Sequence, residues 1–517
     1  MKYLSHIATT VSCFGGFLFG YDLGVISGVL AMPSFAPYFG MQGDAQHIAK
    51  VKGDIVSLLQ AGCCVGALLI NFFADPFGRK KAIMLGSVVF LIGGILQTVA
   101  QNVDTMMAGR FVTGLGVGAE SALVPMYIAE IAPRKLRGRL GTLWQFLVCC
   151  GIMVSYWVDY GCLRHIPEGD AQWRTPMGIQ LVPGGILLIG MIFLPESLRW
   201  LALKDRKEDV IKNLCALRDL PEDHPDIQKE LNEINTAIAL ERESKTSHWR
   251  EMLEPANLRR LFIGVWLQIF QQWTGTNAIN YYAPDIFGSI GLDSNETDIL
   301  ATGVYGVVKV AFVFVSFFMV DTRLGRRNTL MLGSSIMFIA FFILGGMILG
   351  IQKDNAGRDL TNGNVSVGAK GYVAMVMIYL FAVGYEFSWG PIVWIVCSEI
   401  FPSRTRAASL SITTAFNWAM NAVIAKVTPI MMANITYGTY FFFGCCAVIM
   451  GAFAFLLLPE TRGRSLEEID EVFRGTVWAY KDNYVWRRKD EAVKERKDDP
   501  EEGQKDVSSL EPEQVKH

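Results

Sequence analysis

The chain has 517 residues, of which 51% are hydrophobic, and its formal net charge is −2. Such a high apolar content excludes a single water-soluble domain of this length, so lipid must be the solvent for most of the chain. Most of the 47 basic residues fall in short clusters outside the apolar runs and do not form one basic patch, which argues against a nucleic acid partner.

Twelve apolar runs are long enough to cross a bilayer, which takes about 20 helical residues. They cover residues 9–31, 55–74, 82–100, 106–127, 140–161, 177–194, 260–285, 299–320, 329–350, 371–397, 407–430 and 438–458. The sequence therefore predicts an all-α membrane protein with twelve transmembrane helices.

A stretch rich in Lys, Glu, Asp and Arg, residues 204–255, separates the first six spans from the last six. Its charges cannot cross lipid, and the spacing of its Leu and Ile residues indicates amphipathic helices at the membrane surface. We expect an N-terminal six-helix half (1–203), a cytoplasmic helical linker (204–255), a C-terminal six-helix half (256–473) and a disordered cytoplasmic tail (474–517).

The short loops indicate the orientation, because Lys and Arg are enriched in cytoplasmic loops. One side of the predicted spans holds Arg79, Lys80, Lys81, Arg134, Lys135, Arg137, Arg139, Arg323, Arg326, Arg327, Arg404 and Arg406. That side is predicted to be cytoplasmic and to hold both termini, in a multi-pass protein of the plasma membrane.

Charged motifs recur at equivalent places in the two halves, which indicates a duplicated six-helix unit with a solute site between the halves. The first half has Asp75 with Arg79, Glu130 with Arg137, and Glu196; the second has Asp321 with Arg326, Glu399 with Arg406, and Glu460. We interpret these ten residues as a cytoplasmic gate, whose ion pairs hold that end closed until the halves rock apart. The alternative is that the Arg clusters only fix the topology.

Six further segments carry a family pattern. They are Gly20-Tyr-Asp-Leu-Gly-Val-Ile-Ser-Gly28, Gly109-Arg110-Phe with Gly114, Gly116 and Gly118, Pro125-Met-Tyr-Ile-Ala-Glu130, Pro195-Glu-Ser-Leu-Arg-Trp200, Gln271-Gln-Trp-Thr-Gly-Thr-Asn277 and Pro459-Glu-Thr-Arg-Gly463. With them the chain resembles the sugar porters of the major facilitator superfamily, fungal ones in particular, over nearly all of residues 9–473. The resemblance implies the major facilitator fold of two pseudo-symmetric halves. It also implies sugar contacts at Gln145, Gln271, Gln272, Asn277, Trp394, Asn417 and Asn421.

These residue types suit a polyhydroxylated solute, because an amide both donates and accepts hydrogen bonds. On a helix, Gln271 and Thr274 share one face, and so do Asn417 and Asn421. Trp394 offers an apolar plate for the C–H face of a ring. The alternative for buried amides is that they only join helices to one another.

Charged residues inside apolar spans include Asp22, in the middle of the first span, and Arg110, near the start of the fourth. A charge inside the bilayer costs about 2.5–3.5 kcal/mol on insertion scales, so each needs a partner or a function. The resemblance implies that Asp22 carries a proton and that Arg110 tunes it. The alternatives are a purely structural ion pair, and facilitated diffusion without protons.

Lys309 departs from the family pattern, since it stands where carriers of neutral sugars commonly have a sugar-binding Asn. It lies too deep in its span to reach water and shares a face with Gly306, Val313 and Ser316. A fixed cation favours a carboxylate, which indicates a sugar acid or a polyhydroxy acid of the galacturonate or quinate class. The alternative is that Lys309 pairs internally with Asp22, Glu120 or Glu386, so that the solute is neutral.

The sequence thus predicts a secondary active transporter that imports such an acid by proton symport with alternating access. Its partners would be the solute, protons and the lipid bilayer, with no cofactor and no metal. Alternatives are a carrier of neutral hexoses or pentoses and a nutrient receptor that binds without transport. An enzyme is the least supported class, because the six His residues show no paired arrangement within a span.

Overall fold

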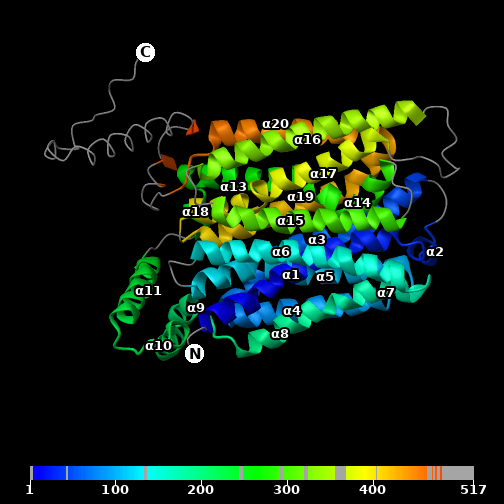
Figure 1. The fold of residues 1–517 in the computed structure, drawn as a ribbon. Helices are drawn as coiled ribbons and strands as arrows, with labels where there is room; N and C mark the ends of the chain where they lie inside the picture. The colour runs from blue at the N-terminus through cyan, green and yellow to red at the C-terminus, as the bar shows by residue number, and fades with distance from the viewer. Residues whose placement is uncertain are drawn as a thin grey trace, which may run out of the picture.

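The computed structural model describes residues 4–41, 45–132, 137–243, 248–290, 295–319, 324–355, 368–402 and 404–462, together with Ile469, Val472, Phe473, Trp478 and Ala479. Regular structure within these residues is helical. Figure 1 shows two helical bundles lying side by side, one from each half of the sequence.

The N-terminal bundle contains six spans, the last of which continues from α7 into α8 across Gln180. Its helices are α1 (Leu4–Ala31), α3 (Ala45–Phe77), α4 (Arg79–Thr98), α5 (Val103–Ile131), α6 (Arg137–His165), α7 (Asp170–Ile179) and α8 (Leu181–Phe193), with the short α2 (Phe35–Tyr38) after the first span. Several begin before the predicted spans, because a helix can extend past the lipid core with polar turns that the apolar pattern does not mark.

The C-terminal bundle also contains six spans, two of which are interrupted. Its helices are α13 (Pro255–Trp273) with α14 (Thr276–Ser289), α15 (Asn295–Met319), α16 (Gly325–Asn355), α17 (Ala369–Glu386) with α18 (Trp389–Ile400), α19 (Arg406–Ile435) and α20 (Gly438–Leu457). The first break falls at Gly275, whose φ of +84° is a left-handed conformation that favours glycine. The second break falls at Phe387 and Ser388.

Ten helical segments within the described residues are long and apolar enough to cross a membrane. The two spans that fall short are α13 with α14, and α19. These two carry five of the predicted solute-binding amides, which lowers their hydropathy. A helix with polar residues can span the membrane when its polar face is turned to protein and not to lipid.

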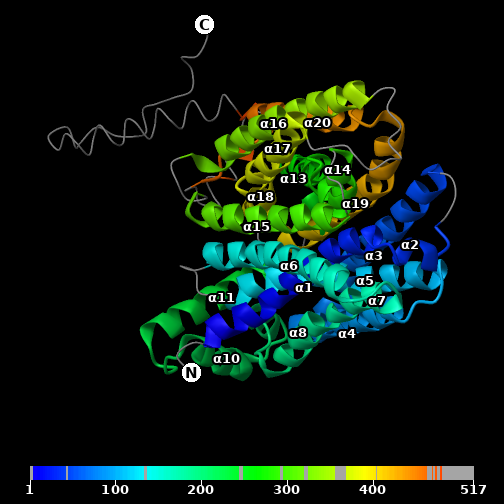
Figure 2. The same ribbon diagram turned by 45° about the vertical axis from the view of Figure 1, so that its right-hand side comes forward.

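The two bundles meet along two pairs of helices, α3 against α19 and α6 against α15. Figure 2 shows α15 lying beside α6 at this boundary. The connecting helices α9 (Leu198–Leu203), α10 (Lys207–Arg218), α11 (Pro225–Glu243) and α12 (His248–Met252) link the halves. Of these, α9, α10 and α11 lie at one end of the molecule, opposite α2 and α7 (Figure 1).

Close helix packing in the N-terminal bundle depends on small residues. A Cβ atom at Gly20 of α1 would lie 1.9 Å from the Val148 carbonyl oxygen of α6, and one at Gly118 of α5 would lie 2.0 Å from the Cys63 carbonyl oxygen of α3. Spans in lipid gain stability from such backbone contact, since no hydrophobic effect drives them together. The glycine pattern of the sequence therefore brings α1 close to α6. Asp22 lies on α1.

Candidate functional site

The first break in the C-terminal bundle gathers buried amides. Gln271 and Gln272 lie at the end of α13, and Asn277 lies in the first turn of α14. All three are buried. Thr274 follows the last residue of α13, and its hydroxyl donates to the carbonyl oxygen of Gln271 at 2.7 Å, so it closes the helix end.

Hydrogen bonds join these amides into a continuous network. Asn417 Nδ2 donates to Gln271 Oε1 at 2.8 Å, and Gln272 Nε2 donates to Asn417 Oδ1 at 2.9 Å. Asn277 Nδ2 donates to Gln272 Oε1 at 2.5 Å, and Asn280 Nδ2 donates to Asn277 Oδ1 at 3.0 Å. The network therefore runs from α19 across the helix break into α14.

Asn421 joins a neighbouring contact between the two halves. Tyr281 of α14 donates its hydroxyl hydrogen to Asn421 Oδ1 at 2.9 Å and accepts from Gln60 Nε2 of α3 at 2.8 Å. Tyr156 of α6 donates to the carbonyl oxygen of Asn280 at 2.9 Å. The N-terminal half thus contacts the amide network at Asn280, and it contacts the neighbouring pair of Tyr281 and Asn421 through Gln60.

Gln145 and Trp394 lie farther along the same boundary. Gln145 is half-buried, and its Nε2 lies 3.9 Å from Cys149 Sγ. Trp394 is half-buried, and its ring centroid lies 6.1 Å from that of Trp144 of the N-terminal half. Neither shares a hydrogen bond with the amides in the described part of the chain.

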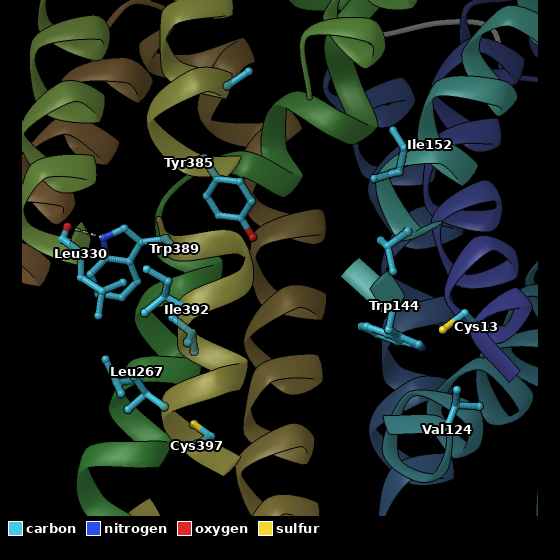
Figure 3. Close-up of a cluster of buried hydrophobic side chains, with 14 of the residues drawn as sticks. Cys13, Val124, Trp144, Ile152, Leu267, Leu330, Tyr385, Trp389, Ile392 and Cys397 are labelled. Carbon is cyan, nitrogen blue, oxygen red and sulfur yellow. Dashed lines mark hydrogen bonds between the residues drawn. The ribbon is translucent and has the colours of Figure 1, made fainter. Parts of the chain in front are cut away.

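Two other aromatic residues flank the second break. Trp389 is fully buried and donates from Nε1 to the carbonyl oxygen of Leu330 at 3.0 Å. Figure 3 shows the Trp389 ring turned toward Leu330, whereas the hydroxyl of Tyr385 points the opposite way. Gln271 reaches this break too, because its Nε2 donates to the carbonyl oxygen of Trp389 at 2.9 Å. The two breaks are therefore joined directly.

Lys309 lies on the buried face of α15 and is 2% exposed. Its Nζ lies 3.1 Å from Glu386 Oε1 and donates to Asn280 Oδ1 at 2.9 Å. Among the carboxylates considered from the sequence, Glu386 is the one that contacts Lys309. Since Asn280 belongs to the amide network, Lys309 and Glu386 adjoin the predicted solute site.

Asp22 and Arg110 form an ion pair inside the N-terminal half. Arg110 Nη1 lies 3.0 Å from Asp22 Oδ1, and both side chains are 0% exposed. Asp22 Oδ2 and Arg110 Nη2 have no hydrogen-bond partner within the described residues. The pair is therefore buried but only partly satisfied, a state that costs more inside a protein than in water.

The repeated charges form matching clusters where α4 and α16 begin. In the first half, Arg79 Nε lies 3.6 Å from Glu130 Oε2, and Glu196 accepts the backbone N–H of Lys80 at 3.1 Å. Ser197 donates its hydroxyl hydrogen to Glu130. Burial raises the pKa of the Glu196 carboxyl, and its backbone hydrogen bonds oppose that shift.

The second half repeats this geometry. Arg326 Nη2 lies 3.1 Å from Glu399 Oε1, and Glu460 accepts the backbone N–H groups of Arg326 at 2.9 Å and of Arg327 at 3.1 Å. Thr461 donates to Glu399 Oε2 at 2.6 Å. The duplicated motifs thus fold into duplicated structures that join helices of the same half.

The remaining predicted gate residues either contact groups close to them in the chain or lie outside the described part. Asp75 pairs with Arg79 at 3.3 Å within one helical turn, and Arg406 Nη2 donates to the carbonyl oxygen of Phe401 at 3.0 Å. Asp321 lies outside the described residues, as does the side chain of Arg137.

Three further residues belong to the candidate site, although no role was predicted for them from the sequence: Gln268, Asn280 and Tyr281. Asn417 donates to Gln268 Oε1 at 2.6 Å, which places Gln268 at the other end of the network. Spacing could have found two of them, because Gln268 precedes Gln271 by three residues and Asn280 follows Asn277 by three. Tyr281 gave no such signal, since an aromatic residue in a span is ordinarily packing.

Known proteins are similar to this chain along nearly its whole length. A family model described as "Sugar (and other) transporter" matches residues 8–473. A "Probable quinate permease" of Neosartorya fischeri is 36% identical over 486 residues, covering 92% of this chain and 88% of that relative. A "Probable quinate permease" of Aspergillus niger is 36% identical, covering 91% and 87%.

Solved structures of a bacterial protein are similar as well. The "proton:xylose symporter XylE bound to 6-bromo-6-deoxy-D-glucose" has a TM-score of 0.75 and 27% identity, covering 91% of this chain and 99% of that chain. The inward open conformation of the xylose transporter XylE from E. coli has a TM-score of 0.70 and 27% identity, covering 90% and 98%.

Proposed function

Because the chain belongs to the sugar porter family of the major facilitator superfamily, a family of multi-pass membrane transporters and not of enzymes, we propose that it imports a sugar acid or polyhydroxy acid by proton symport. The family and the fold expected from the sequence are confirmed. The solute, the coupling and the residues that carry them are our proposal.

The observation that carries the proposed solute class is Lys309, a buried ammonium bonded into the amide network through Asn280. A charge-assisted hydrogen bond from this ammonium would favour a carboxylate over a hydroxyl. Relatives at 36% identity bear the name "Probable quinate permease", and quinate is a cyclic polyhydroxy acid. Galacturonate offers the same combination of a carboxylate and ring hydroxyls.

Solute hydroxyls would be bound by the amides of Gln145, Gln271, Gln272, Asn277, Asn417 and Asn421, beside Trp394. In the structure several of these amides bond to one another, so an entering polyol would replace amide contacts with solute contacts at little net cost. A hydroxyl lacking at one position would leave buried groups unpaired, which is the physical basis of selectivity.

Proton coupling would use Asp22 and Arg110. Protonation of Asp22 removes its negative charge, which loosens its attraction to Arg110 and changes the relative stability of the two conformations. A solute bound between the halves would then move together with the proton.

Alternating access would follow from rocking of the two halves. We assign the end with α9, α10 and α11 to the cytoplasm of a plasma membrane protein, since the Lys and Arg clusters begin α4 and α16 there. At the opposite end, ion pairs link the two halves: Lys52 with Asp285 at 3.1 Å, and Lys426 with Asp54. Breaking these contacts would open the path from outside.

A neutral monosaccharide is the second candidate, and a specific contact favours it. Glu386 neutralises Lys309 within the protein, so a solute without charge would meet no unpaired cation. The likeness to a proton:xylose symporter points the same way.

Uptake of labelled quinate and galacturonate by cells that express the chain tests the proposal. Competition by unlabelled quinate, galacturonate, glucose and xylose separates the two candidates, and a protonophore tests the coupling. Preference for glucose or xylose over both acids would refute the acid class. Binding of solute without any uptake would indicate a receptor.

A further inference from the structure

We propose that Glu386 is an exchangeable counter-ion: it pairs with Lys309 in the empty carrier, and it takes up a proton when the carboxylate of the solute replaces it. This inference rests on the proposed acid solute and adds a second proton-binding site to the one proposed at Asp22. The site lies in the C-terminal half, whereas Asp22 lies in the N-terminal half.

The pair is closely confined. Glu386 is 0% exposed, with one oxygen toward Lys309 and the other, Oε2, accepting from Cys149 Sγ at 3.3 Å. Lys309 Nζ also lies over the rings of Tyr305 and Tyr385, 5.5 Å and 5.9 Å from their centroids. The ammonium already has its acceptors within the protein, Glu386 and Asn280, and we infer that a solute carboxylate takes the place of Glu386.

The cost of an unbalanced buried charge then favours uptake of a proton. The empty site holds one ammonium and one carboxylate and is neutral. A solute carboxylate would bring a second negative charge into a site that excludes water, where an uncompensated charge is strongly unfavourable. One proton from water converts the Glu386 carboxylate to the carboxylic acid, so the loaded site holds ammonium, solute carboxylate and neutral Glu386 and is neutral again.

The groups that face Glu386 support this exchange. They are Lys309 and Tyr305 on α15, Cys149 on α6 and Tyr385 on its own helix. Lys309 is the cation of this set, so no second positive charge within it holds Glu386 ionised once the ammonium turns to the solute. The neutral acid could donate its hydrogen to Cys149 Sγ, reversing the present bond.

The position of Glu386 in the chain couples the exchange to movement. It is the last residue of α17, directly before the break that separates this helix from α18. A change in its partner therefore acts at the point where α18 can turn relative to α17. Cys149 belongs to the other half, so loss of the Lys309 contact also alters a contact between the halves.

The experiment measures proton uptake on addition of quinate or galacturonate to the purified full chain in weakly buffered detergent solution. It uses the Asp22→Asn variant, in which Asp22 cannot contribute. We expect about one proton bound per acid bound, and we expect Asp22→Asn/Glu386→Gln to bind the acid without a proton. The matched control is Asp22→Asn/Glu120→Gln, which removes another buried carboxylate, on α5, and should keep the proton uptake.

The outcomes separate this inference from the proposed function. If neither acid binds but xylose or glucose does, the proposed solute class fails. If an acid binds to Asp22→Asn without proton uptake, or if Glu386→Gln keeps that uptake, the counter-ion exchange alone is wrong. Should Glu386→Gln fail to fold, Glu386→Asp serves instead: it keeps a carboxylate at a changed distance, and an unchanged pH midpoint of proton uptake would overturn the assignment.

Discussion

Arg110 holds Asp22 at 3.0 Å with one nitrogen, while the second oxygen of the carboxylate has no partner within the described residues. A buried carboxylate that is half satisfied can gain a proton at a smaller cost than one that accepts several hydrogen bonds. We therefore expect Asp22→Asn to abolish accumulation of solute against a gradient while leaving exchange of solute in place. Uptake by the unmodified chain should fall as the external pH rises, because fewer protons are available.

The check is to compare accumulation and counterflow in vesicles at equal expression, with and without a protonophore. Accumulation that persists in Asp22→Asn and resists the protonophore would contradict proton symport through this residue.

The amide network makes Asn277 a sensitive position, since it connects Gln272 to Asn280. Asn277→Ala should raise the half-saturation concentration about fivefold to a hundredfold, because an unmatched buried polar group costs roughly 1–3 kcal/mol and each 1.4 kcal/mol is tenfold. Gln271→Ala and Gln272→Ala should act in the same direction. Asn434→Ala is the matched control, because Asn434 is an exposed amide near the end of α19. Unchanged kinetics in all three site variants would remove these residues from the site.

Lys309 tests the charge of the solute. Lys309→Asn alone would leave Glu386 buried without its cation, so the double variant Lys309→Asn/Glu386→Gln is the cleaner change. We expect this pair of substitutions to reduce uptake of the acid about tenfold to a hundredfold, the value of one charge-assisted hydrogen bond of about 1.5–3 kcal/mol. Uptake of glucose or xylose should be retained or improved. An acid uptake equal to that of the unmodified chain would show that Lys309 does not select a carboxylate.

The two charged clusters at the starts of α4 and α16 predict a matched pair of effects on protein stability. Gly78 and Gly325 have φ of +102° and +75°, and a Cβ atom there would lie 2.3 Å from Glu196 Oε2 and 2.4 Å from Glu460 Oε2. Gly78→Ala and Gly325→Ala should each destabilise the protein by about 1–3 kcal/mol, seen as a lower melting temperature in detergent. Gly185→Ala of α8 is the control, because among the described residues, its chain neighbours and own helix backbone aside, no atom lies within 4 Å of its added Cβ. A melting temperature unchanged in both test variants would mean that these loops relax freely.

The sequence predicted those parts of the fold that depend on local pattern. The lengths of the apolar runs predicted the spans. The recurrence of Glu196 and Glu460 predicted the duplication, and the clusters around these two residues have matching contacts. Members of the amide network in the candidate site could also be picked out from the sequence, because Gln272, Asn277 and Asn417 are amides within apolar runs, whereas their binding of a solute stays a prediction.

Which side chains meet was harder to predict. Asp22, Glu120 and Glu386 were equal candidates for the ion-pair partner of Lys309. The position of a carboxylate within a span predicts its depth in the membrane but not which helix it faces. The choice depends on how α15 lies against α17, which is set by packing over many residues. The breaks at Gly275 and Ser388 were hidden for a similar reason, since each lies inside a run that reads as one span.

The two mirrored glutamates, Glu196 and Glu460, have a mechanical consequence. Each accepts a hydrogen bond from the backbone at the start of a helix in its own half, so it ties that helix start to the segment that carries the glutamate. The helices can bend more easily at the breaks at Gly275 and Ser388. One break lies near Gln272 and the other near Glu386. If solute binds at the proposed site, these two breaks lie next to the groups that would contact it, so a movement that starts there could reach the distant end of each half through helices whose starts are held in place.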